Sequence, residues 1–442
     1  MPVAYLRSNS VRDRWNAAVT VGTGTLLGFT IAQSKWLFSA ALAFMMFLFL
    51  WPVETALGGY AFLVPFDSVN VIGGSETGTS LTWIAGTGAL VTLILTGLAY
   101  DRLQTPPRAA LWWAGFIIWS AASILWAVNP QQVIRRLPTA LSLFLLYLVV
   151  VCIQVRRREL SRIAMMVIAG GCVASAYASF TFIQGGMADR TSLELGSNNA
   201  DPNQFAASLL LPLSLAVGEF FSSSTKGLRY LMLAATALIS LGMLLTMSRG
   251  AFIAVMVMTA VYFRHLRFTW RMLIPVAVLG CALATMPQTF FSRFEESFST
   301  GGAGRIYIWQ AGVASLQQYA GAGAGLENFE EAYQSYAGWA KRFRGFQRGA
   351  HNIYLAIAVE LGIYGLLLAF LAIRSHLHSV RELRVAFSGN PIPMRVVASY
   401  AACLGLLTAG FFLDILWRKS FWLAWIFLAL TVREARQSRR YA

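Results

Sequence analysis

Charged residues are scarce in this chain of 442 residues: they make up 12% of it, whereas hydrophobic residues make up 57%. A soluble protein of this length carries about twice that charged fraction. The scarcity therefore excludes an ordinary soluble fold. Alternating segments of about ten residues, typical of a membrane β-barrel, are also missing. Long continuous apolar runs take their place, and they predict an all-α, polytopic integral membrane helical bundle.

Cysteine is rare and shows no pattern. None of the four cysteines belongs to a CxxC pair or has a histidine nearby, so we expect buried helix residues rather than metal ligands. Internal repeats and Pro/Gly-rich linkers are missing as well, which predicts one integral domain, 1–442, with an inserted outer loop at 288–350. No cleavable signal peptide is expected, because the apolar stretch after Arg14 continues into further membrane segments. The cysteines are Cys152, Cys172, Cys281 and Cys403.

Acidic residues are few: 19 Asp and Glu face 35 Lys and Arg, which gives a formal net charge of +16. In a soluble protein this balance suggests a nucleic-acid partner, but no RNA- or DNA-binding pattern is visible. Cytoplasmic loops rich in Lys and Arg explain the charge in a membrane protein. We therefore predict membrane lipids as partners and no nucleic acid.

Basic clusters define the predicted topology. Clusters such as 156–158 and 374–384 mark cytoplasmic junctions, and strict alternation of the spans from residue 162 onwards places all of them inside. In the N-terminal third the count stays open: either 15–53 makes only one full crossing, which gives twelve spans, or 55–66 is a short extra crossing, which gives fourteen. We favour about twelve. The predicted spans are 15–33, 36–53, 81–100, 109–127, 137–155, 162–184, 204–222, 228–246, 250–263, 271–287, 352–373, 395–414 and 420–432.

The same alternation places arginines on the outer face, against the usual tendency of arginine to stay inside. The outer segments are 185–203, 247–250, 288–350 and 415–419. Arginine retained there indicates binding of a phosphate-bearing substrate at the membrane surface. Snorkelling to lipid headgroups, or pairing with nearby glutamates, is the alternative. The arginines are Arg190, Arg249, Arg305, Arg342, Arg344 and Arg348.

The outer loop 288–350 is patterned. Ile306, Trp309, Val313 and Leu316 share one face of a predicted helix, and apolar residues from Leu326 to Ala340 share a face of a second. The glycines at 321–325 join the two and supply either a hinge or a close backbone approach. The two helices are expected to lie over the bilayer or to cap a cavity.

Two polar positions flank this region. His351 stands where the polar loop ends and the next apolar span begins, so its imidazole is placed to accept a proton near neutral pH. Upstream, Asp201 or Asn199 is suited to cap the helix that starts near Pro202. The side-chain amides around it, Asn203 among them, also suit a sugar-binding surface, because carboxamides both donate to and accept from hydroxyls.

These segments together resemble the O-antigen ligase and polymerase superfamily, over about 190–415 and in the right order. The upstream run DPNQFA at 201–206 resembles an Asn-Pro-Asn-type motif of that family. The further runs are SRGA at 248–251, GRIYIW at 304–309, GAGLENF at 323–329, and HNIYL at 351–355 followed by ELGIYG at 360–365.

The resemblance implies a metal-independent membrane glycosyltransferase. Its members move glycans from undecaprenyl diphosphate on the periplasmic face, so it implies a bacterial Gram-negative inner-membrane enzyme. The expected function is an O-antigen ligase that transfers O-antigen polysaccharide to a hydroxyl of lipid A-core, with inversion. An O-antigen polymerase, an O-linked protein oligosaccharyltransferase and a lipid-linked glycan transporter without chemistry stay open as alternatives.

The chemistry assigns roles to residues on the outer side. Arg190, Arg249 and Arg305 are the expected ligands of the donor diphosphate, because guanidinium grips phosphate oxygens bidentately. His351 is the expected general base, since His265, His376 and His378 fall in predicted cytoplasmic loops. No Asp-x-Asp motif occurs in the outer segments, so we expect no metal ion and no other cofactor. The expected substrate-binding residues are Asn203, Asn352, Tyr354 and Arg348.

Overall fold

A computed structural model describes most of the chain, namely residues 51–67, 71–72, 79–185, 191–195, 198–199, 201–266, 277, 280, 304–341, 345, 348–387 and 390–440. Helices dominate these residues, and two small antiparallel hairpins pair β1 (Val71–Ile72) with β2 (Thr79–Ser80) and β3 (Glu194–Leu195) with β4 (Asn198–Asn199). Within the described residues, 7 helices are long and apolar enough to cross a membrane. The predicted all-α, polytopic membrane fold is confirmed.

The helices follow the predicted apolar segments closely. The predicted span 15–33, and most of 36–53 and 271–287, lie outside the described residues. The helices are α3 (Pro52–Leu63), α4 (Leu81–Ala99), α5 (Arg108–Ala122), α6 (Pro130–Val151), α7 (Arg157–Gln184), α8 (Pro202–Ser208), α9 (Leu210–Ser222), α10 (Lys226–Leu245), α11 (Arg249–His265), α14 (Arg305–Tyr319), α15 (Phe329–Gln334), α16 (Ile353–Ala386), α17 (Met394–Ala409) and α18 (Lys419–Arg440), with 3-10 turns η1 (Val64–Phe66), η2 (Ser123–Leu125) and η4 (Ala337–Trp339).

Helix α16 corrects one prediction. It continues to Ala386 through the basic cluster that the sequence placed in a loop. His376 and His378 therefore lie on a helix and not in a cytoplasmic loop. His376 is 2% exposed, and its Nε2 lies 3.0 Å from the hydroxyl of Tyr147. Basic residues predict a membrane face well, but they do not end a helix, because Lys and Arg are good helix formers.

Large aromatic side chains hold the bundle together around α18. Trp113 of α5 and Tyr147 of α6 pack against Trp422, with ring centroids 5.0 and 5.8 Å apart. Phe421 and Trp425 of α18 are also fully buried. Aromatic rings bury large areas and gain from edge contacts, so α18 ties α5, α6 and α16 into one unit.

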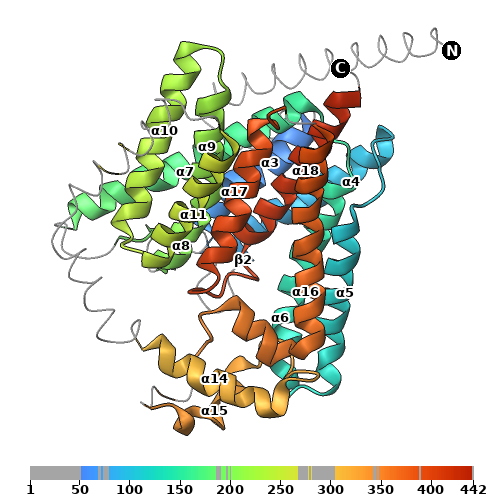
Figure 1. The fold of residues 1–442 in the computed structure, drawn as a ribbon, viewed down its shortest axis with the longest axis vertical. Helices are drawn as coiled ribbons and strands as arrows, with labels where there is room; N and C mark the ends of the chain where they lie inside the picture. The colour runs from blue at the N-terminus through green and yellow to red at the C-terminus, as the bar shows by residue number, and fades with distance from the viewer. Residues whose placement is uncertain are drawn as a thin grey trace, which may run out of the picture.

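The segment that carries α14 and α15 lies below the bundle, at the end opposite to that where α18 finishes (Figure 1). Its glycine turn docks into a kink of α16 at Gly362, where φ is 62° and ψ is −161°. The Ala324 amide donates to the Val359 carbonyl at 2.9 Å, and the Ile363 amide donates to the Ala320 carbonyl at 2.9 Å. The structure thus shows the close backbone approach that the glycines predicted.

Only the first of the two helices predicted in this segment is confirmed as one continuous helix. On α14, Ile306 and Val313 are exposed, whereas Ile308 and Ala311 point into the protein. The second predicted helix is broken into the short α15 and the turn η4. Sequence periodicity indicates an amphipathic helix but cannot tell which apolar stripe meets protein when a second one is available to meet lipid.

Candidate active site

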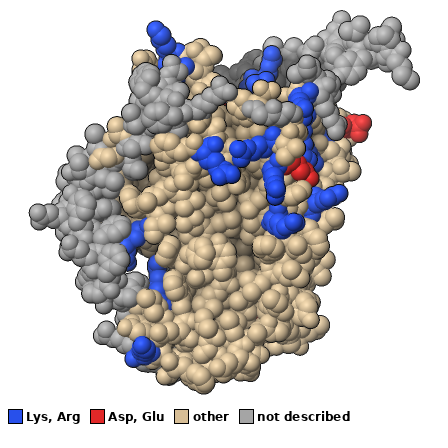
Figure 2. All heavy atoms as spheres, in the orientation of Figure 1, with Lys and Arg blue, Asp and Glu red and all other residues tan. Residues whose placement is uncertain are grey.

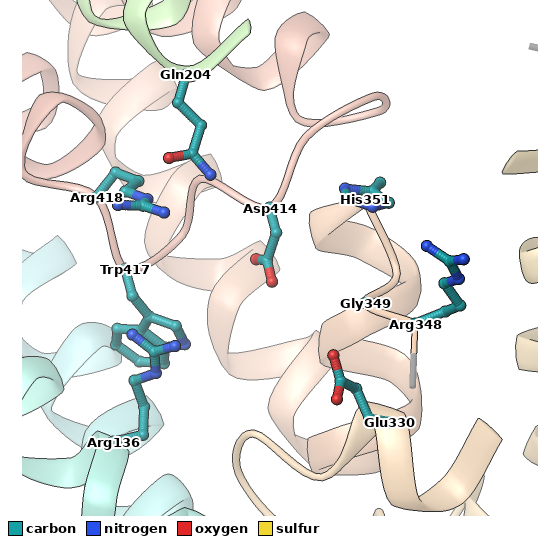
Figure 3. Close-up of a pocket in the computed structure, with 9 residues that line it drawn as sticks. All are labelled: Arg136, Gln204, Glu330, Arg348, Gly349, His351, Asp414, Trp417 and Arg418. Carbon is teal, nitrogen blue, oxygen red and sulfur yellow. The ribbon is translucent and has the colours of Figure 1, made fainter. Parts of the chain in front are cut away.

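Several helix ends meet at a polar cavity of about 360 Å³ at this lower end of the bundle. Side chains from far apart in the sequence face it: Arg136 from the start of α6, Gln204 from α8, His351 before α16, and Asp414 and Arg418 between α17 and α18. Figure 3 shows these groups around a common space, with Arg348 and Glu330 closing one side. The cavity is therefore rich in charge and lies where chain segments leave the bundle.

His351 lines the cavity in a strained backbone conformation. Its φ is 46°, in the left-handed region that residues other than glycine seldom adopt. Strain of this kind is held at functional sites more often than elsewhere. Burial and the neighbouring Arg305 both lower the pKa of the His351 imidazole, and Asp201 partly opposes them. The imidazole is therefore neutral at pH 7 and able to accept a proton.

Arg305 and Arg249 share one electrostatic environment. Burial lowers the pKa of Arg305 most, and the positive charge of Arg249 lowers it further. Each arginine is the first residue of its helix, α14 and α11. The amide groups and the dipole at a helix N-terminus favour an anion, and guanidinium groups add charge and a bidentate fork. Two of the three predicted donor-binding arginines thus form one positively charged region, in which Arg305 is the one that interacts with His351. Neither of the two is among the residues that line the polar cavity.

A hydrogen bond joins α14 to the residue directly before His351. The indole nitrogen of Trp309, one turn after Arg305, donates to the carbonyl oxygen of Ala350 at 2.9 Å. Gly304, with φ of 81°, turns the chain into α14. Helix α14 therefore carries Arg305 and also helps to position His351.

The other predicted site residues have mixed surroundings. Asn352 caps α16, because its side-chain oxygen accepts from the amides of Tyr354 and Leu355 at 3.0 Å each. The Tyr354 hydroxyl donates to the Leu407 carbonyl at 2.7 Å. Asn203 follows the capping residue Asp201 in α8. Substrate binding by Asn352, Tyr354 and Asn203 stays a prediction.

Arg348 lines the cavity, but three other predicted arginines lie outside the described residues. They are Arg190, Arg342 and Arg344. The donor-binding role of Arg190 accordingly stays a prediction from the sequence.

Several residues that line the cavity were not predicted, although the sequence contains a signal for them. Strict alternation puts 128–136 and 415–419 on the outer face, so the criterion that selected Arg249 also applies to Arg136 and Arg418. Arg136 forms an ion pair with Glu327 of the outer segment. Asp414 ends a predicted span with a charge, and burial and Glu327 raise the pKa of its carboxyl to about 6.

Residues 234–370 match a family model described as O-antigen ligase. This match supports the resemblance to the O-antigen ligase and polymerase superfamily that the sequence motifs indicate. The matched region contains Arg249, Arg305 and His351, whereas Asn203 and Asp414 lie outside it. Among curated protein sequences, none gives a significant match to the chain. Proteins of the matched family form a group of glycosyltransferase-like ligases and polymerases.

Proposed function

We propose that the protein is an O-antigen ligase: it moves O-antigen polysaccharide from undecaprenyl diphosphate to a hydroxyl of lipid A-core. The reaction would take place on the periplasmic face of a Gram-negative inner membrane. The observation that carries the proposal is that His351, which lines the polar cavity of a membrane bundle, interacts electrostatically with Arg305, which in turn interacts with Arg249. All three lie inside the region that matches the family.

The arginines act on the donor. The sugar is linked through its anomeric carbon to a diphosphate, which leaves readily once its growing negative charge is neutralised. Arg305 and Arg249 lie close enough for their charges to repel, and an anion between them relieves that repulsion. Their interaction with the diphosphate strengthens as the bond breaks, which is what lowers a barrier. This step needs no metal ion.

His351 acts on the acceptor. The acceptor oxygen forms the new bond to the anomeric carbon, its proton passes to the imidazole, and the diphosphate departs with the electrons of the broken C–O bond. Direct attack on the face opposite the leaving group inverts the anomeric configuration. The lowered pKa of His351 keeps the imidazole unprotonated before the reaction.

Purified protein with two substrates tests the proposal. Undecaprenyl-diphosphate-linked glycan and lipid A-core should give a ligated product, detected as a mass shift of the acceptor. Lipid-linked glycan that lengthens without lipid A-core would identify a polymerase instead. Donor binding without any covalent product would identify a transporter and overturn the assignment.

The orientation is tested by chemical labelling. Single cysteines at Gln317, exposed on α14, and Ser224, exposed between α9 and α10, are introduced into a cysteine-free background. A membrane-impermeant maleimide in intact spheroplasts should label position 317 and spare 224. Labelling at 224 alone would place the cavity on the cytoplasmic side.

A further inference from the structure

A second cavity, of about 570 Å³, lies at the far ends of two helices that begin at the candidate active site. Helix α11 begins at Arg249 and reaches this cavity with Arg264 and His265. Helix α16 begins directly after Asn352 and reaches it with Phe370 and the residues that follow. The 17 residues of α11 separate the two sites by about 25 Å, at about 1.5 Å per residue.

The cavity concentrates positive charge that the described part of the chain does not neutralise. Arg264, Arg374, Arg381 and Arg384 line it, and none of them forms an ion pair with a described carboxylate. The neighbouring Glu382 instead pairs with His378 and Arg436, at 3.2 and 2.7 Å. Figure 2 shows Lys and Arg side chains gathered over the upper part of this face of the molecule. The site is thus built to receive an anion.

An apolar wall lies beside the arginines. Phe370, Ile373 and Leu377 follow each other at helical spacing on α16, and Phe370 is 59% exposed. The arginines begin at 374 and continue towards the end of the helix, so one face changes from apolar to basic along its length. The ring of Tyr400 on α17, 6.0 Å from that of His265, completes the opposite wall.

This order of groups matches a phospholipid. Acyl chains lie along apolar side chains at bilayer depth, and the phosphate lies where arginine forks reach the membrane surface. A free phosphate ion would make no favourable contact with the apolar wall. A general requirement for basic residues on the cytoplasmic side explains the charge. It does not explain why four guanidinium groups from two helices surround one cavity without an ion pair among the described residues.

We infer that this cavity binds the headgroup of an anionic phospholipid, with its phosphate on Arg374, Arg381 and Arg384 and its acyl chains along Phe370 and Leu377. The site is separate from the polar cavity beneath the bundle, and the inference does not rest on the proposed glycan transfer. Because α11 begins with Arg249 and α16 begins two residues after His351, the bound lipid would steady both helices at the ends remote from these residues.

Native mass spectrometry of the purified, delipidated protein in detergent tests this inference. With dioleoyl phosphatidylglycerol and dioleoyl phosphatidylcholine added in equal amounts, the parent should retain the anionic lipid preferentially. The triple variant Arg374→Ala, Arg381→Ala, Arg384→Ala should retain at least about tenfold less, as expected when three charge-assisted phosphate contacts are lost. The variant Arg381→Lys, Arg384→Lys should retain an intermediate amount, since lysine keeps the charge but not the fork.

A matched control removes three charges elsewhere. The variant Arg157→Ala, Arg158→Ala, Lys226→Ala changes exposed basic residues outside this cavity, and it should retain the anionic lipid as the parent does. Equal losses in the two triple variants would reduce the effect to overall charge and overturn the inference. So would unchanged retention in the cavity variant. Displacement of the lipid by sodium phosphate, as effective as displacement by a second phospholipid, would show a free-phosphate site and also overturn it. Size-exclusion profiles and melting temperatures confirm that all variants are folded.

Discussion

The indole nitrogen of Trp309 donates a 2.9 Å hydrogen bond to the carbonyl oxygen of Ala350, the residue directly before His351. Trp309 follows Arg305 by one turn of α14, so a single helix carries an arginine proposed to bind the donor and also fixes the backbone of the proposed base. His351 is held at a positive φ, a conformation that persists only where the surroundings enforce it. The Trp309 hydrogen bond is one of those constraints.

We expect Trp309→Phe to slow glycan transfer by about 10- to 100-fold, because misplacement of a reacting group by about 1 Å costs on that order. Stability should change little, since one hydrogen bond contributes about 1 kcal/mol. The rate and the melting temperature are measured on the same preparation. The control Trp339→Phe changes an exposed tryptophan of the same outer segment and should leave the rate intact. Equal rates for both variants would remove Trp309 from the positioning of His351.

Replacement of His351 by asparagine tests the base without disturbing the chain. Asparagine tolerates the left-handed backbone that His351 adopts, whereas alanine does not. We expect His351→Asn to lower the transfer rate by about 10²–10⁴-fold, the usual contribution of a positioned base. Binding of the lipid-linked donor, measured by calorimetry, should stay close to that of the parent, because arginines bind the diphosphate. A folded His351→Asn protein that transfers glycan at the parental rate would exclude the histidine as base.

The arginines should act through charge and geometry together. We expect Arg249→Ala and Arg305→Ala to abolish transfer and weaken donor binding, with each protein still inserted and folded. Arg→Lys at either position should recover only part of the activity, since lysine presents a point charge and no fork. Lys341→Ala removes an exposed positive charge of the outer segment and should be silent. Full lysine rescue at both positions would indicate simple charge attraction rather than bidentate binding.

The sequence predicted most of the helices because membrane spans are encoded locally. Apolar runs of nearly the right length, with basic residues beyond their ends, account for α4, α7, α10 and α11 to within a few residues. Alternation of the spans then placed Arg249, Arg305 and His351 on one side, and in the structure Arg305 interacts electrostatically with both Arg249 and His351.

What the sequence did not predict depends on contacts between distant segments. Asp414 faces the cavity because the α17–α18 connection passes beside the start of α16, where the Ile353 amide donates to the Gly410 carbonyl at 2.8 Å. Arg136 reaches the cavity because the outer segment docks on α6 and supplies Glu327 as its partner. No local sequence pattern indicates either contact. The sequence did not indicate which face of α14 turns inward for the same reason, since its partner helices are remote in sequence.

The pH profile of transfer should distinguish His351 from Asp414. A protonated imidazole cannot accept a proton, so the rate should fall on acidification, with a midpoint below the ordinary histidine value of about 6.5 because burial and Arg305 lower the pKa of His351. Asp414, whose pKa is raised to about 6, titrates in the same range. Asp414 is not among the groups that shift His351, so Asp414→Asn should change the maximal rate but keep the midpoint. If the rate of Asp414→Asn no longer falls on acidification, the fall in the parent is caused by the Asp414 carboxyl and not by His351.

The docking of the glycine turn on α16 makes a prediction about stability. A Cβ at Gly362 would lie 1.9 Å from the Gly321 carbonyl oxygen, and the φ of +62° is unfavourable for any side chain. We expect Gly362→Ala to lower the free energy of unfolding by about 2 kcal/mol or more. Transfer should fall as well, because the displaced turn connects directly to α14 and its Arg305. Gly227→Ala, at a site with no atom within 4 Å of the new Cβ, should leave the melting temperature unchanged or slightly raised, since alanine favours a helix. A melting temperature for Gly362→Ala equal to that of this control would show that the turn does not rest in the kink of α16.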